Sequence, residues 1–166
     1  MLAFWLLVIG VASRVVVHAW NFTPVIALAL FSGVYLKKKH ALVLPIALFA
    51  ITDIILGFHE TMFFTWGTIL MIVGIGFWVR KNKSFKTVLG GGVSSAVLFY
   101  ITTNFGVWLM SGIYPMTFSG LSECYVAAIP FFRNSLASTL IYGLIFFGGY
   151  EAIAARVRNT RLSFVL

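Results

Sequence analysis

Six apolar segments, separated by short basic or polar stretches, constrain the fold of this chain more than any other feature. They cover about residues 2–19, 24–36, 41–57, 62–79, 88–109 and 130–149. Of the 166 residues, 61% are hydrophobic and 10% are charged, whereas a soluble domain carries about 25% charged residues. So little polar surface cannot cover a water-soluble globule. The pattern therefore predicts an all-α membrane protein, a compact bundle of six transmembrane helices forming one domain over 1–166.

The basic residues predict the orientation of this bundle. Ten of the twelve lysines and arginines fall in three clusters, with three at 37–39, four at 80–86 and three at 156–161. Basic loops stay in the cytoplasm, so both termini are expected inside a bacterial inner (cytoplasmic) membrane. The same clustering explains the net charge of +8 without nucleic acid as a partner. We interpret the first segment as a retained helix rather than a signal peptide, because no basic residue precedes its apolar run.

The stretch 114–134 is too polar, and too rich in Gly and Pro, to be a plain membrane helix. Tyr114 before Pro115 favours a turn, and Gly120 favours a tight bend. Residues 121–129 would form a short helix that dips back into the membrane, and Pro130 would start the sixth span. The charge count places this stretch outside. We therefore expect an outward re-entrant loop between helices five and six, with its backbone satisfied by protein or water.

Aromatic and polar side chains in and before this stretch are typical of a small-molecule pocket, with flat apolar walls and a few polar groups. An interfacial belt of aromatic anchors would have the same composition. Ser135, Ser138, Thr139 and Tyr142 also share one helix face, which would form either a cavity wall or a close helix contact. The candidate ligand-binding residues are Asn104, Trp108, Tyr114, Glu123, Cys124, Tyr125, Arg133 and Asn134.

Charged residues at membrane depth usually pair or line a cavity. Arg14 and Asp53, near the outer ends of spans one and three, are therefore expected to form an ion pair that either locks two helices or supports the ligand pocket. His18, His59 and Cys124 are weaker candidates for a metal site, because no HxxxH or HExxH spacing supports one. No catalytic motif is present, so we expect neither an enzyme nor a cofactor.

Four blocks of the sequence carry a family resemblance. They are NFTPVIALALFSG, TDIILGFHE, TTNFGVWL and YPMTFSGLSECYVAAIPFFRNSL. These blocks resemble those of a small uncharacterised bacterial membrane family. That family is similar to the S components of energy-coupling factor (ECF) transporters, which this chain also resembles in its six short helices and its two termini inside. Small residues of the first helix meet a coupling subunit in S components. Here the small pair Ala29 and Gly33 lies in the second span.

The resemblance implies a membrane protein that binds a vitamin-like, water-soluble micronutrient from outside and mediates its uptake. Its partners would be the lipid bilayer, the small-molecule ligand, and a transmembrane coupling subunit with ATPases. Some solitary relatives handle cobalamin through a cysteine, a role for which Cys124 would be the candidate. The alternative is a structural or scaffold subunit of a larger membrane complex, whose outer polar residues would contact other proteins.

Overall fold

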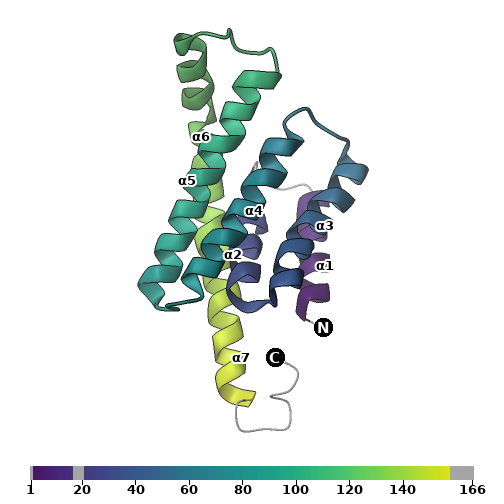
Figure 1. The fold of residues 1–166 in the computed structure, drawn as a ribbon, viewed down its shortest axis with the longest axis vertical. Coiled ribbons are helices and arrows are strands. Elements are labelled where there is room, and N and C mark those ends of the chain that lie inside the picture. The colour runs from purple at the N-terminus through teal and green to yellow at the C-terminus, as the bar shows by residue number, and fades with distance from the viewer. Residues whose placement is uncertain (1, 17–20, 158–166) are drawn as a thin grey trace.

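The computed structural model describes residues 2–16 and 21–157, and helices connected by short links account for most of them (Figure 1). No strand occurs in this part of the chain. The elements are α1 (Leu2–Val15), α2 (Val25–Tyr35), α3 (Lys38–Leu56), α4 (Met62–Val79), α5 (Phe85–Met110), α6 (Phe118–Gly143), the π-helix η1 (Leu144–Gly148) and α7 (Gly149–Val157).

Four of the helical stretches are long and apolar enough to cross a membrane. They are α3, α4, α5 and the continuous stretch Phe118–Arg156 formed by α6, η1 and α7. Helices α1 and α2 have 14 and 11 residues, fewer than the roughly 20 that a straight span needs. The all-helical prediction is therefore confirmed, and the lengths and apolarity are consistent with a membrane protein.

The predicted re-entrant loop is wrong. Residues 118–143 form one helix that runs through Pro130 without a break. Its start is at Thr117, whose hydroxyl accepts a hydrogen bond from the Gly120 backbone N–H at 3.2 Å. Gly120 packs closely on Pro115, so a Cβ at this position would lie 2.1 Å from the Pro115 carbonyl oxygen. Gly120 thus allows the loop at Pro115 to pack tightly on the start of α6. Pro130 lies on the exposed face of α6 and does not end the helix.

Helix α2 is the centre of the bundle. All ten residues from Val25 to Val34 are buried, and the helix contacts α1, α3, α4, α5, α6 and η1. Its closest neighbour is α4, because Gly33 and Gly76 face each other without side chains. A Cβ on Gly33 would lie 2.4 Å from the Val73 carbonyl oxygen and 2.8 Å from the Gly76 Cα. The backbones of α2 and α4 therefore touch, as small residues permit in membrane helices.

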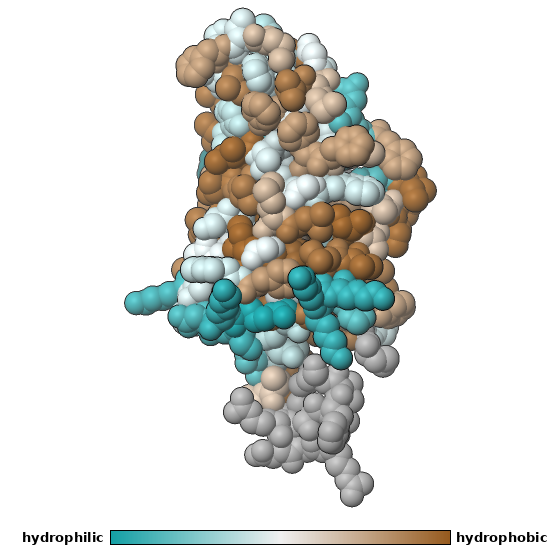
Figure 2. Space-filling model, viewed as in Figure 1, coloured by the Kyte–Doolittle hydropathy of each residue, from teal (hydrophilic) through white to brown (hydrophobic). Residues whose placement is uncertain are grey.

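The links α2–α3 and α4–α5, which carry Lys37 and residues 80–84, lie at the same end of the helices (Figure 1). Figure 2 shows the long hydrophilic side chains gathered in a band at this end, with a largely hydrophobic surface beside it. Arg80 ties the two links together, since its Nε donates to the Val34 carbonyl oxygen at 2.9 Å and its guanidinium also donates to the Leu36 carbonyl. These carbonyls end α2, where a cation is favoured. We call this end of the bundle the lysine end.

Helices α5 and α6 form a hairpin that extends beyond α1–α4 at the opposite end (Figure 1). Each helix has 26 residues, compared with 18 in α4. The turn between them is apolar and exposed, with Ile113, Met116 and Phe118 retaining 71%, 60% and 84% of their accessible surface. The α5–α6 hairpin therefore projects beyond the ends of helices α1–α4 on this side of the bundle (Figure 1).

Candidate functional site

Arg14 and Asp53 form an ion pair where α1 and α3 end. Asp53 Oδ1 lies 3.1 Å from an Arg14 terminal nitrogen, and the carboxylate is 1% exposed against 17% for the guanidinium. The two helices run in the same direction and pack on each other, so their last turns meet at the same end of the bundle. A charge this deeply buried needs a partner, and the pairing follows from that need.

The surroundings hold each charge in place. The other Arg14 terminal nitrogen donates to the Thr52 hydroxyl at 2.6 Å, and the guanidinium carbon lies 4.1 Å from the centroid of the Phe49 ring. Trp66 Nε1 donates to Asp53 Oδ2 at 2.8 Å. His59 Nε2 approaches the same oxygen at 3.9 Å, an ion pair only while the imidazole is protonated.

The ion pair is close but not well aligned. Among the described residues, no donor makes a hydrogen bond to Asp53 Oδ1, although Arg14 lies 3.1 Å from it. The attraction is therefore mainly electrostatic, and one buried carboxylate oxygen keeps unused acceptor capacity. Arg14 is the more exposed partner, and its accessible side faces a cavity.

We call this space the Arg14 cavity; its volume is about 220 Å³. Its lining combines a guanidinium, an imidazole, an amide and hydroxyls with two aromatic rings, one of which lies under the guanidinium. Typical sites for drug-sized ligands have volumes of about 300–1,000 Å³, so this one suits a smaller solute. Its lining comes from α1 through α6 and the links that precede α2 and α4: Arg14, Asn21, Thr23, Val25, Ile26, Phe49, His59, Thr65, Phe99 and Ser135.

Comparison with known proteins gives a family and no function. The sequence profile of a family of unknown function, DUF6580, matches residues 1–161. The chain belongs to this family. Neither a curated protein nor a solved structure matches it significantly. The arrangement of side chains is therefore the only basis for a functional conclusion about this DUF6580 chain.

Three of the predicted ligand-binding residues, Cys124, Tyr125 and Trp108, make side-chain hydrogen bonds that hold the α5–α6 hairpin together, and a fourth, Asn104, bonds within α5. The Tyr100 hydroxyl, on α5, donates to the Tyr125 carbonyl of α6 at 2.6 Å. In return, the Tyr125 hydroxyl donates to the Ile101 carbonyl of α5 at 2.7 Å. Cys124 is buried, and its Sγ donates to the Asn104 carbonyl at 3.4 Å. Further bonds run from Asn104 Nδ2 to the Tyr100 carbonyl at 2.7 Å and from Trp108 Nε1 to the Pro115 carbonyl at 3.0 Å.

The other predicted residues lie apart from these. Glu123 and Arg133 are exposed on α6, whereas Tyr114 and Asn134 are half-buried. None of the eight lines the Arg14 cavity of this DUF6580 chain, although Ser135, the neighbour of Asn134, does. Their role as ligand contacts stays a prediction.

The hydroxyl face of α6 points into the bundle, as its spacing predicts. Ser135, Ser138 and Thr139 are buried, and the last two donate to the Ser135 carbonyl at 3.0 and 2.7 Å. The hydroxyl hydrogens of Ser138 and Thr139 therefore bond within their own helix. Ser135 is the member of this face that reaches the Arg14 cavity. The spacing could have identified it as a site residue, whereas nothing in the sequence singles out Phe99 or Thr65.

The metal candidates are not brought together in the part of the chain that the structure describes. His18 lies outside the described residues. His59 lies near Asp53, at 3.9 Å, whereas Cys124 is on α6 where it packs on α5. No group of three His, Cys, Asp or Glu side chains among the described residues could hold a metal ion. The chemistry that the Arg14 cavity offers is hydrogen bonding and charge attraction toward a polar solute.

Proposed function

We propose that this DUF6580 chain is a multi-pass protein of the bacterial cytoplasmic membrane that binds a small, polar, water-soluble solute from the outer side and mediates its uptake, in the manner of the S components of ECF transporters. The observation that carries the proposal is the Arg14 cavity. It is concave and small, and it places a partly exposed guanidinium beside hydroxyl, amide and aromatic groups.

The position of the cavity supports binding from outside. It lies where α1 and α3 end and α2 and α4 begin, which is the end of these helices opposite the lysine end. Basic loops remain on the cytoplasmic side during membrane insertion. With this orientation the cavity faces the outer side, and both α1 and α7 have their terminal ends inside.

The chemistry of the cavity indicates the class of solute. Arg14 and Asp53 neutralise each other, so a strongly charged ligand is not required for balance. The guanidinium, the Asn21 amide and the hydroxyls of Thr23 and Ser135 instead suit carbonyl or carboxylate oxygens. Phe49, which carries the Arg14 guanidinium over its ring, and Phe99 add aromatic surface that suits an unsaturated or ring-shaped body. A micronutrient of low molecular weight fits this description.

Uptake would need an energised partner, because the 166 residues contain no phosphate-binding loop. In S components a coupling subunit meets small residues of the first helix. Here Gly33 is used inside the bundle against Gly76, and Ala29 is fully buried, so a coupling subunit would have to dock on another face.

The test is mass spectrometry of small molecules that co-purify with the protein. We expect a solute with wild type and its loss in Arg14→Gln, whereas Arg133→Gln, an exposed arginine on α6, should retain it. Asn21→Gly is a milder variant, since Asn21 has φ 58° and glycine keeps this backbone while removing the amide from the cavity. It should weaken binding and leave the fold intact.

Two outcomes would contradict this placement of the site. Retention of the solute by both Arg14→Gln and Asn21→Gly would exclude the Arg14 cavity. Loss of the solute in Arg133→Gln alone would move the site to the predicted residues of the hairpin. In either case the solute itself would still support a binding protein.

A scaffold subunit is the second candidate, and the exposed hairpin turn favours it. Ile113, Met116 and Phe118 form an apolar end that projects beyond the other helices. Such an end suits contact with another membrane protein. Isolation of a stoichiometric protein partner without any bound solute would favour this function over uptake.

A further inference from the structure

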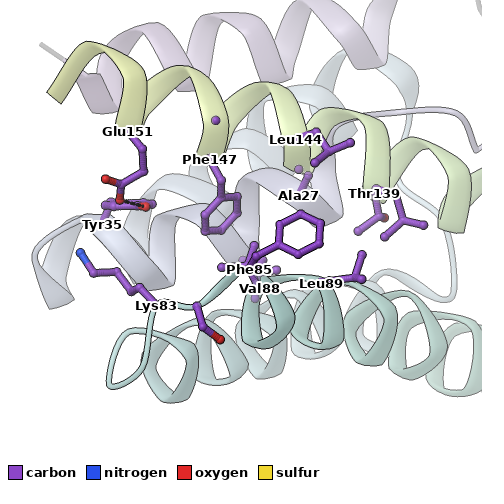
Figure 3. Close-up of a pocket in the computed structure, with 16 residues that line it drawn as sticks. Ala27, Tyr35, Lys83, Phe85, Val88, Leu89, Thr139, Leu144, Phe147 and Glu151 are labelled. Carbon is purple, nitrogen blue, oxygen red and sulfur yellow. Dashed lines mark hydrogen bonds between the residues drawn. The ribbon is translucent and has the colours of Figure 1, made fainter. Parts of the chain in front are cut away.

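A second and larger cavity lies at the lysine end, between α2, the first turns of α5, and the stretch from α6 through η1 to α7 (Figure 3). Its volume is about 600 Å³, within the range of about 300–1,000 Å³ that is typical of ligand sites. We call it the lysine-end cleft. It belongs neither to the Arg14 cavity nor to the predicted ligand site, and the two cavities share no lining residue.

The lining of the cleft is divided into a polar and an apolar part. Lys83, Tyr35 and Glu151 lie at one end, whereas Leu89, Leu144 and Thr139 lie at the other, with Phe147 in the wall between them (Figure 3). A ligand that fits both parts must have a polar head and an apolar body. That is the chemistry of a lipid.

The polar end favours a negatively charged head on its α5 side. Lys83 lines the cleft, and Lys81 and Lys86 are exposed within the same few residues. Ser84, which also lines the cleft, caps α5 by accepting a hydrogen bond from the Thr87 N–H at 3.2 Å. The start of a 26-residue helix adds a partial positive charge that attracts phosphate groups.

The acid at the mouth is already engaged. Glu151 accepts a hydrogen bond from the Tyr35 hydroxyl, and the Lys83 ammonium lies 5.0 Å from the centroid of the Tyr35 ring. Glu151 therefore belongs to the α7 side of the mouth, and Lys83, which lies just before α5, is on the opposite side (Figure 3).

Missing side chains create the depth of the cleft. Gly92, Gly143 and Gly148 line it, and a Cβ added at Gly143 or Gly148 would meet nothing within 4 Å. The π-helix η1 follows Gly143 and ends with Gly148, and π-helical turns are frequent at functional sites. The space can therefore be filled by substitution without a clash at the new Cβ.

We propose that the lysine-end cleft binds an anionic phospholipid, with one acyl chain along its apolar wall and the phosphate beside Lys83 and the first turn of α5. The mouth is flanked by apolar side chains that a bilayer would cover, since Phe85 and Leu144 are 69% and 62% exposed. The lysines mark the level at which headgroups lie on the cytoplasmic side. The head and the chain of a lipid would thus meet the matching parts of the cleft.

The experiment measures bound lipid by native mass spectrometry of the detergent-solubilised protein. It uses dioleoylphosphatidylglycerol, dioleoylphosphatidylcholine and inorganic phosphate as separate probes. Wild type should retain phosphatidylglycerol in preference to phosphatidylcholine. Lys83→Gln should reduce that preference about fivefold, the contribution of one lysine near an anionic surface, and Lys81→Gln, outside the cleft, should reduce it less.

Filling the cleft separates chain binding from headgroup binding. Gly148→Leu should abolish retention of both lipids, and Gly143→Leu provides a second variant with the same expected result. Gly149→Leu is the matched control, because Gly149 is equally open but does not line the cleft. Retention of lipid by both filled variants would overturn the proposal. Displacement of the lipid by inorganic phosphate alone would also overturn it, since the site would then recognise an anion without a chain.

Discussion

Removing one partner of the Arg14–Asp53 pair should destabilise the protein far more than removing both. Asp53 is 1% exposed, and its Oδ1 has Arg14 at 3.1 Å as its charged neighbour. In Arg14→Met the buried carboxylate keeps the Trp66 hydrogen bond but loses its countercharge. Breaking a buried ion pair in this way costs about 3–5 kcal/mol. For a chain of this size that corresponds to a fall in the melting temperature of roughly 6–20 °C.

The double variant Arg14→Met/Asp53→Leu leaves no unpaired charge. Replacement of a buried pair by apolar residues of similar size is often neutral, so the double variant should recover at least about 2 kcal/mol relative to the sum of the single changes. Arg133→Met is the control, because an exposed arginine should change stability by no more than about 0.5 kcal/mol.

The lone cysteine supplies the assay. Cys124 is 2% exposed and is the only cysteine in the sequence, so a thiol-reactive fluorophore reports its exposure on heating. A double variant as unstable as the sum of the two single variants would refute the reasoning. The charges would then act independently, and the 3.1 Å contact would carry no coupling energy.

Three further changes test the fold with the same thermal assay. Gly33→Ala should lower the free energy of unfolding by about 1–3 kcal/mol or more, because its Cβ would lie 2.4 Å from the Val73 carbonyl oxygen. Gly74→Ala, on the open face of α4, should be neutral or stabilising. Equal effects of the two changes would contradict the close α2–α4 packing. Tyr125→Phe should cost about 0.5–1.5 kcal/mol through the lost bond to the Ile101 carbonyl, and no change would show that the hairpin does not depend on it. Thr117→Ala should cost about 1 kcal/mol through the lost N-cap of α6, and Thr117→Ser should restore it; failure of the serine to do so would exclude capping as the cause.

The helices were predictable because a membrane helix is specified mainly by its length and apolarity. Five of the six predicted segments agree with α1–α5 to within about four residues at each end. The failure at Pro130 has a physical cause. Local rules make proline a helix start, but α6 continues through Pro130, which lies on its exposed face, because the loss of one backbone hydrogen bond is small beside the packing of the whole helix on α5.

The ion pair was predictable and the cavity was not. Arg14 and Asp53 are rare charges in apolar segments, and such charges must find partners. The convergence of Phe99, Thr65 and Ser135 on one space depends instead on how α4, α5 and α6 turn their faces toward α2. The α2–α4 part of that packing includes the Gly33–Gly76 contact, which a single sequence does not reveal as a pair.

The composition of the α5–α6 hairpin indicated that polar side chains lie among apolar ones, but it did not indicate that these side chains hydrogen-bond to the helix backbones. Tyr125, Cys124 and Asn104 have the aromatic and polar character of a ligand pocket. The same kinds of group also satisfy backbone carbonyls in two long helices that pack side by side: Tyr125 and Cys124 donate across to α5, and Asn104 donates within α5. Composition cannot separate these uses, because both place hydrogen-bonding side chains between apolar surfaces.

The Arg14 cavity and the lysine-end cleft are neighbours along the same helices. On α6, Ser135 lines the first and Thr139 the second, a separation of four residues or roughly 6 Å of helix rise. On α2, Ile26 lines the Arg14 cavity and the adjacent Ala27 lines the lysine-end cleft. The buried residues between them on α5 and α6 include Ala96 and Ser138, which are small. Occupants of the two cavities would therefore act on one thin layer of contacts, and any effect of bound lipid on solute affinity must be matched by an equal effect of the solute on lipid affinity.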